Sequence, residues 1–82
     1  MSLNIQIEPV QILNKTGITV NAYVIMYDGV NCRLYWWLTD SDGNKLIDGN
    51  YDVPDTIISN WGIDDSIILN SLVTDNNFQI IN

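Results

Sequence analysis

Residues 18–39 read ITVNAYVIMYDGVNCRLYWWLT, two runs of β-branched and aromatic residues separated by Asp-Gly-Val-Asn. Such residues favour the pleated surface of a strand, and Asp-Gly between two strands is typical of a tight hairpin. We therefore expect neighbouring antiparallel strands at residues 18–27 and 32–39, and these strands form the centre of the predicted fold.

The sequence before this hairpin predicts a first strand. Apolar and polar residues alternate over residues 3–7, and the pattern resumes over residues 10–12. Pro9 interrupts the alternation, and because proline cannot donate to a ladder, it indicates an edge strand or a bulge. Residues 14–17 are expected to form a turn in which Gly17 takes a positive φ.

The sequence after the hairpin predicts a fourth strand. The run Asp-Ser-Asp-Gly-Asn at residues 40–44 is rich in turn formers and predicts a second hairpin loop. A strand is expected to begin at residues 45–47, to bend at Asp48-Gly49-Asn50 and to close at residues 51–53. Connections this short predict a meander in chain order.

The last third of the chain changes to a helical period. Pro54 and Asp55 suit a first helical turn, and Ile57, Ile58 and Trp61 share one face behind them. Residues 64–66 are N-cap types for a second helix, which ends at residues 75–77 and leaves residues 78–81 as a short tail or fifth strand. The apolar stripe of this second helix consists of Ile68, Leu69, Leu72 and Val73.

These elements predict one α+β domain over residues 1–82. Its architecture is expected to be an antiparallel β-meander of about four strands with two short C-terminal helices packed on one face. The core between helices and sheet is expected to contain Ile57, Ile58, Trp61, Leu69 and Leu72.

The composition excludes several classes of protein. The 82 residues include three basic and ten acidic side chains, no histidine and one cysteine, with a net charge of −7. The usual acid/base group near neutral pH and the commonest metal ligand are therefore missing, and one cysteine forms neither an intrachain disulfide nor a Cys-based zinc site. We expect no cofactor and no metal. Three scattered basic residues also argue against nucleic acid and an anionic membrane as partners.

Residues 40–44 resemble the start of a calcium loop. Such a loop needs glycine at its sixth position and a bidentate glutamate at its twelfth, whereas here Gly43 is fourth and Tyr51 is twelfth. The expectation is therefore a hairpin turn without a metal.

Catalytic groups are equally hard to assemble from this sequence. Asp64 and Asp65 are adjacent at a helix start, where capping is the simpler interpretation than an acid/base pair. Cys32 has only Arg33 beside it in sequence and no base to activate it, so it fits a small hydrophobe in a reducing compartment. The prediction is that the protein is not an enzyme.

The aromatic residues of the central hairpin are the candidate site. Alternation places Tyr23, Ile25 and Tyr27 on one face of their strand, and it places Tyr35 with Trp37. Two short helices cover one face of such a sheet, so aromatic side chains on the other stay exposed, unless the first strand and the tail cover them. An exposed aromatic patch usually marks an interface. The interface candidates are Tyr23, Tyr27, Tyr35 and Trp37.

The second half of the chain resembles a known type of small protein. Residues 42–51 read DGNKLIDGNY and residues 61–67 read WGIDDSI. This pattern, G-x-x-L-x-x-G-N-Y followed by W-G-x-D-D-x-[VI], resembles small proteins encoded by tailed bacteriophages and prophages, over about residues 33–73. The resemblance implies an accessory component of the virion, in tail, baseplate, neck or capsid, and it carries over no catalytic or ligand residues.

Three functional hypotheses follow. The first is a non-enzymatic virion structural or assembly module that binds itself or a larger virion protein, forms a homo-oligomer, and is made in the bacterial host cytoplasm. The alternative is a small acidic phage-encoded inhibitor of a basic host protein, although the Asp residues are spread over different loops. A third hypothesis, a carbohydrate-binding module, requires an exposed aromatic platform with adjacent polar groups.

Overall fold

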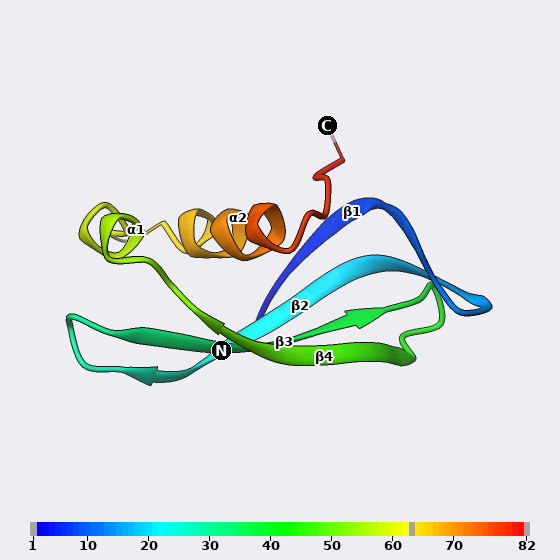
Figure 1. Cartoon of the computed structure of the whole chain (residues 1–82), viewed down its shortest axis with the longest axis horizontal. Helices are drawn as coiled ribbons and strands as arrows, with labels where there is room; N and C mark the ends of the chain where they lie inside the picture. The colour runs from blue at the N-terminus through cyan, green and yellow to red at the C-terminus, as the bar shows by residue number, and fades with distance from the viewer. Residues whose placement is uncertain (1, 63, 82) are drawn as a thin grey trace.

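The computed structural model describes residues 2–62 and 64–81, and this part of the chain forms one four-stranded sheet and two helices (Figure 1). Every neighbouring pair of strands is antiparallel, and the strand order is β1-β2-β3-β4. The predicted α+β class and the antiparallel meander are therefore confirmed. The elements are β1 (Ser2–Ile12), β2 (Lys15–Tyr27), β3 (Cys32–Thr39), β4 (Lys45–Asp52), α1 (Asp55–Ser59) and α2 (Ser66–Asp75).

The register of the strands defines an inner and an outer face of the sheet. Val20 faces Leu38 and Ala22 faces Trp36, and all four side chains are buried. Because residues directly opposite each other share a face, these pairs mark the inner face. The opposite side, called the outer face below, carries the alternate residues of β2, β3 and β4.

Helix α2 shares its core with the inner face. The buried side chains of α2, from Ile68, Leu69, Leu72 and Val73, belong to one hydrophobic cluster with Val20, Leu34 and Leu38. Ile57 and Ile58 of α1, and Trp61 behind it, are half-buried against the same cluster. Of the five residues expected in the core, Leu69 and Leu72 therefore belong to the buried cluster, and Ile57, Ile58 and Trp61 pack against it.

Local hydrogen bonds hold both ends of α2, although its N-cap residue, Asp65, makes no side-chain capping bond. The Asp64 carboxylate accepts the Ser66 N–H at 3.0 Å and the Ser66 hydroxyl at 2.6 Å. At the other end Asn77 takes φ 64°, and the Phe78 N–H reaches back to the Val73 carbonyl at 3.0 Å. Asparagine tolerates this left-handed conformation, which is typical of the residue just after a helix.

The sequence predicted two features near the edge strand β1 in part: the irregularity at Pro9 and the pairing of the C-terminal tail. The pairing of β1 with β2 is irregular between Gln6 and Val10, around Pro9, and β1 is the edge of the sheet, as predicted. The expected fifth strand is reduced to a single bridge between Ile80 and Ile7, with a hydrogen bond of 2.7 Å from the Glu8 N–H to the Gln79 carbonyl. The tail therefore lies beside the edge of β1 that does not pair with β2.

Two glycine predictions were wrong. β2 already includes Gly17, and the positive φ of this turn belongs to Leu13, at 57°. Gly17 is required for packing instead, because a Cβ there would lie 2.4 Å from Cδ2 of Leu38. Strand β4 also runs unbroken past Gly49, without the bend expected at residues 48–50. Gly49 faces Trp36, and its missing side chain leaves room for the indole, whose Nε1 would lie 3.2 Å from a Cβ.

Tyr51 joins the last strand to α2. Its hydroxyl hydrogen-bonds the Ser71 hydroxyl at 2.5 Å and donates to the Asp75 carboxylate, four residues further along the same helix. Burial raises the pKa of Tyr51 to about 12, and the hydrogen bond to Asp75 acts in the same direction. The phenol therefore stays protonated in the folded chain at pH values where a free tyrosine ionises.

Because of this raised pKa, the free energy of unfolding depends on pH in alkaline solution. Between about pH 10 and 12 the unfolded Tyr51 loses its proton while the folded one keeps it, so the free energy of unfolding falls as pH rises. Urea unfolding at pH 9 and pH 11.5 should show this loss, and Tyr51→Phe should show a smaller one. An equal loss in both proteins would contradict the assignment of the effect to Tyr51.

No helix within residues 2–62 and 64–81 is long and apolar enough to span a membrane.

Candidate functional site

Three of the four predicted interface residues meet on the outer face. Tyr23 of β2 lies directly opposite Tyr35 of β3, and Trp37 follows Tyr35 on the same side of β3. The ring centroids are 5.4 Å apart for Tyr23 and Tyr35, 5.8 Å for Tyr23 and Trp37, and 5.5 Å for Tyr35 and Trp37. These separations and the tilted, edge and stacked geometries are those that aromatic pairs favour. We call Tyr23, Tyr35 and Trp37 the outer aromatic cluster.

The outer aromatic cluster is only partly shielded from solvent. Tyr23 is 40% exposed, and Tyr35 and Trp37 are half-buried, while the inner-face Trp36 between them is 7% exposed. The tyrosine and tryptophan rings shield one another, and all three remain partly accessible to solvent. Rings held by mutual contact lose little further freedom when a partner binds.

Tyr27 does not belong to this cluster. The pairing of β2 with β3 shifts between Val24 and Met26, and beyond this bulge Tyr27 faces the buried Cys32. The Tyr27 ring then packs on Trp61, with centroids 4.9 Å apart. The prediction that Tyr23 and Tyr27 share a face was therefore wrong. A bulge inserts one residue into one strand and inverts the facing of all that follow, and simple alternation has no signal for it.

A polar network borders the cluster where β3 and β4 lie side by side. The Tyr35 hydroxyl donates to the Asp48 carboxylate at 2.6 Å, and the Lys45 ammonium donates to that hydroxyl at 3.0 Å and to Asp48 at 3.2 Å. The Lys45 Nζ also lies 5.8 Å from the centre of the Tyr35 ring. Hydrogen bonds from Tyr35 and Lys45 lower the pKa of the Asp48 carboxyl, so Asp48 is a carboxylate at neutral pH.

A second ion pair lies toward the other end of the same two strands. Arg33 faces Asp52 across β3 and β4, and its Nε donates to the Asp52 carboxylate at 2.7 Å. This hydrogen bond and the positive charge of Arg33 lower the pKa of Asp52. On the β2 side, the polar residues that border the cluster are uncharged. There the Asn21 amide donates a hydrogen bond to the Thr39 hydroxyl at 3.1 Å. Sequence reasoning missed both ion pairs. Arg33 and Asp52 lie on two strands, so their pairing requires the register, whereas Lys45 and Asp48 are three residues apart in β4, a spacing that strict alternation places on opposite faces.

The outer face is electrically balanced although the chain is strongly acidic. Its four ionisable side chains from β3 and β4 are two cations, Arg33 and Lys45, and two anions, Asp48 and Asp52. The rest of the sequence contains eight acidic residues and one basic residue, so it carries the whole net charge of −7.

Several of the remaining carboxylates accept hydrogen bonds from backbone N–H groups of the turns in which they lie. Asp28 accepts the N–H groups of Val30 and Asn31 at 2.9 and 2.7 Å, and these bonds lower its pKa. Asp40 accepts the N–H groups of Asp42 and Asn44, both at 2.9 Å. The predicted turn-forming role of residues 40–44 is therefore confirmed.

The predicted role of Cys32 as a small hydrophobe is confirmed as well. Cys32 is 3% exposed within the hydrophobic cluster, and burial raises the pKa of its thiol. A thiol in this environment is a poor nucleophile, because the reactive form is the thiolate.

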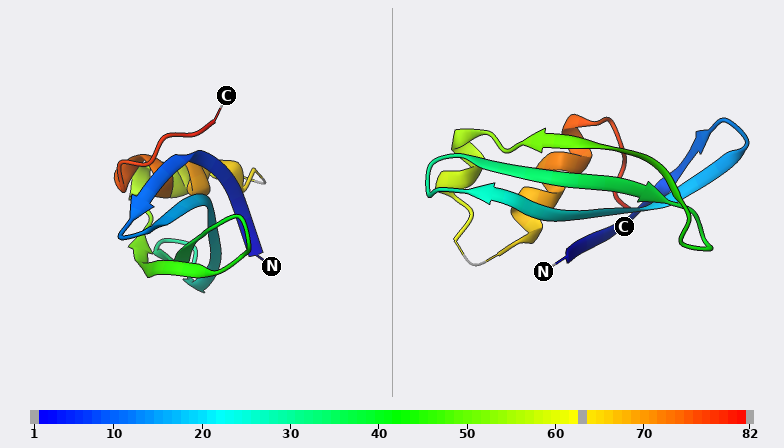
Figure 2. Two further views of the ribbon diagram at one scale, coloured as in Figure 1. Left: turned by 90° about the vertical axis from the view of Figure 1, so that its right-hand side faces the viewer. Right: turned by 90° about the horizontal axis from the view of Figure 1, so that it is seen from below.

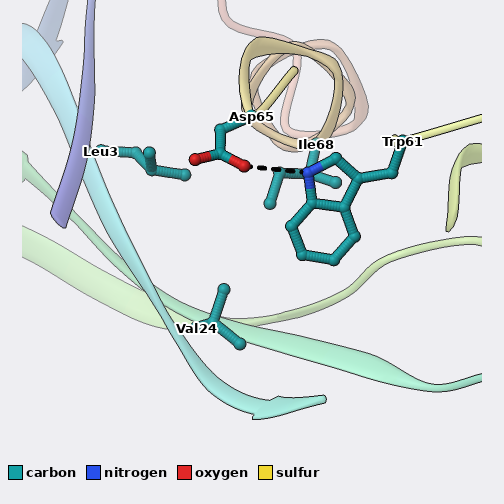
Figure 3. A pocket seen from close by; sticks show the side chains of 5 residues that line it. All are labelled: Leu3, Val24, Trp61, Asp65 and Ile68. Atoms are coloured by element: carbon teal, nitrogen blue, oxygen red, sulfur yellow. Dashed lines mark hydrogen bonds between the residues drawn. The ribbon is translucent and has the colours of Figure 1, made fainter. Parts of the chain in front are cut away.

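A small cavity lies between the first two strands and the segment that leads into α2 (Figure 3). It has a volume of about 190 Å³ and is lined by Leu3, Val24, Trp61, Asp65 and Ile68. The Trp61 indole Nε1 donates to the Asp65 carboxylate at 3.0 Å across its wall. Because this bond uses the polar atom of the indole, Asp65 has a structural role, and the cavity is mainly an apolar gap beside the core.

Comparison with family models, with curated proteins and with solved structures finds no match for this chain. Its function is therefore inferred from the outer face and from the sequence.

Proposed function

We propose that this protein is a non-enzymatic assembly module that binds another protein through the outer face of its sheet. The outer aromatic cluster carries this proposal, because tyrosine and tryptophan side chains that contact one another and stay partly accessible are what protein interfaces favour. The polar border formed by Lys45, Asp48 and Asn21 matches the polar rim that surrounds such an apolar centre.

The proposal includes a finer arrangement of the fold, with both helices on the inner face. It is supported by the shared hydrophobic cluster of α2 and the inner face, and by Figure 1, where α1 and α2 run along the same side of the ribbon. The right-hand view of Figure 2 looks onto the sheet with α2 crossing behind the strands. This arrangement leaves the outer face to a partner.

The biological setting we propose is the virion of a tailed phage. The resemblance of residues 42–51 and 61–67 to small phage proteins supports a role as tail, baseplate, neck or capsid accessory protein, made in the bacterial host cytoplasm. A second candidate, an acidic inhibitor of a basic host protein, is favoured by the net charge of −7 outside the outer face. The two candidates use different surfaces, so one experiment separates them.

Trp37→Ala tests the proposal. Tagged wild-type protein is used to capture partners from phage-producing bacteria and from disrupted virions, at low and high salt. Loss of the stacked indole should weaken capture at least about 30-fold, the effect of losing one interface hot spot of about 2 kcal/mol. Circular dichroism should keep the β signal. Leu13→Ala is the control, because it removes a 95% exposed hydrophobic side chain from the β1–β2 turn.

Each outcome decides between the candidates. Capture that Trp37→Ala abolishes and Leu13→Ala leaves intact supports the outer face. Capture that survives Trp37→Ala but is lost at high salt favours the acidic inhibitor, because screened charges then carry the binding. Unfolding of Trp37→Ala would show that the ring belongs to the core and would contradict the assignment of the outer face.

A further inference from the structure

We propose that the partner of the outer face is the outer face of a second copy of this chain, in a two-fold dimer with the two sheets stacked face to face. This inference rests on the proposed function, since it uses the same surface and names its occupant. It is argued from the distribution of charge, the size of the face and its self-complementary chemistry.

Charge limits how two copies of this chain approach each other. Each copy carries a net charge of −7, and contact between acidic surfaces is therefore repulsive. The ionisable side chains of β3 and β4 on the outer face sum to zero. A face-to-face dimer keeps the acidic residues of the helical segments, Asp55, Asp64, Asp65 and Asp75, behind each sheet. A helical layer is about 10 Å thick, close to the screening length at 0.1 M salt.

The size of the outer face suits a weak dimer. Strand β3 has eight residues and is therefore about 26 Å long, and the three strands that form the outer face, spaced about 4.8 Å apart, are about 14 Å wide. The flat footprint is thus about 370 Å², and the relief of the side chains adds to it. Standard interfaces bury about 800 Å² per partner, so we expect a dissociation constant of about 100 μM or weaker.

The chemistry of the face fits its own copy. A two-fold axis in the plane of contact sets the aromatic centre of one copy against that of the other, as in the isologous contacts of most homodimers. Stacked sheets lie about 10 Å apart, which two layers of interdigitating rings fill. Each ion pair contains both signs, so a two-fold axis across the strands can set an arginine or lysine of one copy against a carboxylate of the other.

Sedimentation equilibrium of the full chain over a wide concentration range, at 50 mM and 500 mM NaCl, tests the dimer. We expect a monomer–dimer equilibrium that is unchanged or tighter at high salt, because salt screens the repulsion between two copies of charge −7. Trp37→Ala should weaken the dimer at least about 30-fold. An interface held by opposite charges would instead weaken at high salt.

Charge variants locate the interface without touching the aromatic rings. Arg33→Glu makes the face negative and should weaken the dimer at least about tenfold at 50 mM NaCl, with partial recovery at 500 mM. Lys15→Glu changes the net charge equally at the start of β2 and should have little effect. The double variant Arg33→Glu/Asp52→Arg restores the balance and should restore the dimer.

The failures of the two proposals are distinguishable. A monomer at every concentration overturns the dimer, whereas capture of a partner that depends on Trp37 would still support the outer face as a binding surface. A dimer that tolerates both Trp37→Ala and Arg33→Glu overturns this inference, because another surface must then hold it. If Trp37→Ala unfolds, the exposed Arg33→Glu variant still decides the question.

Discussion

Leu72→Ala is expected to lower the free energy of unfolding by about 3 kcal/mol. Leu72 is completely buried in α2 within the cluster that α2 shares with the inner face. Truncation removes apolar contacts and leaves a cavity that fully buried neighbours such as Leu34 and Leu38 refill only in part. A chain of 82 residues has a total stability of about 4–12 kcal/mol, so this one change removes a quarter or more of it.

Urea unfolding followed by tryptophan fluorescence measures this loss. The matched control is Asn70→Ala, on the exposed side of the same helix, where alanine is also the better helix former. The control should be neutral or slightly stabilising. Equal and small effects of both substitutions would mean that α2 is not anchored to the sheet, and the proposed arrangement of helices on the inner face would fail with it.

The success of sequence reasoning for α2 has a simple physical basis. Apolar residues with a helical repeat, Ile68, Leu69, Leu72 and Val73, must be buried together, and all four are. The hairpin loops were equally predictable, because Asp28 and Asp40 fold their own backbone through local hydrogen bonds. Local features of this kind depend on a few consecutive residues and can therefore be predicted from the sequence.

The errors fall where distant residues decide the structure. Tyr27 lies outside the outer aromatic cluster because β2 has a bulge before it. Gly49 lies inside an unbroken strand, where its missing side chain leaves room for the Trp36 indole. The ion pair of Arg33 with Asp52 required the register of β3 with β4, and that of Lys45 with Asp48 required the irregular pairing at the start of β4. The candidate site was therefore predicted in its aromatic centre, by three residues of four, but not in its charged border.

The residues that carry the phage resemblance have structural roles in this fold. Gly49 accommodates Trp36, and Tyr51 hydrogen-bonds Ser71 and Asp75. Trp61 donates to Asp65, and Asp64 accepts the N–H of Ser66, the first residue of α2. The variable position of the W-G-x-D-D pattern, Ile63, lies outside the described residues. Several of these contacts attach α2 to the rest of the fold, and the three residues of the outer aromatic cluster, Tyr23, Tyr35 and Trp37, are not among the fixed residues of the pattern.

Gly17→Val is expected to destabilise the fold by about 3 kcal/mol, although valine is the better strand former. A Cβ at Gly17 would lie 2.4 Å from Cδ2 and 2.5 Å from Cγ of Leu38, which is itself fully buried. Relief requires a shift of the strand or a strained rotamer of Leu38, because protein cores are closely packed. Gly49→Ala is the control in a second strand, where the nearest atom is 3.2 Å away, and it should cost less than about 1 kcal/mol.

A double-mutant cycle with Leu38→Ala identifies the clash as the cause. Leu38→Ala alone should cost about 3 kcal/mol by opening a cavity, and Gly17→Val alone costs a similar amount by overfilling the same space. The carbons added at one position match those removed at the other, so the double variant should be more stable than the sum of the two losses predicts, by about 2 kcal/mol. Additive losses would show that the two side chains do not compete for this space. The loss of stability in Gly17→Val would then have to come from the backbone of β2. Such a loss is not expected, because valine is a good strand former.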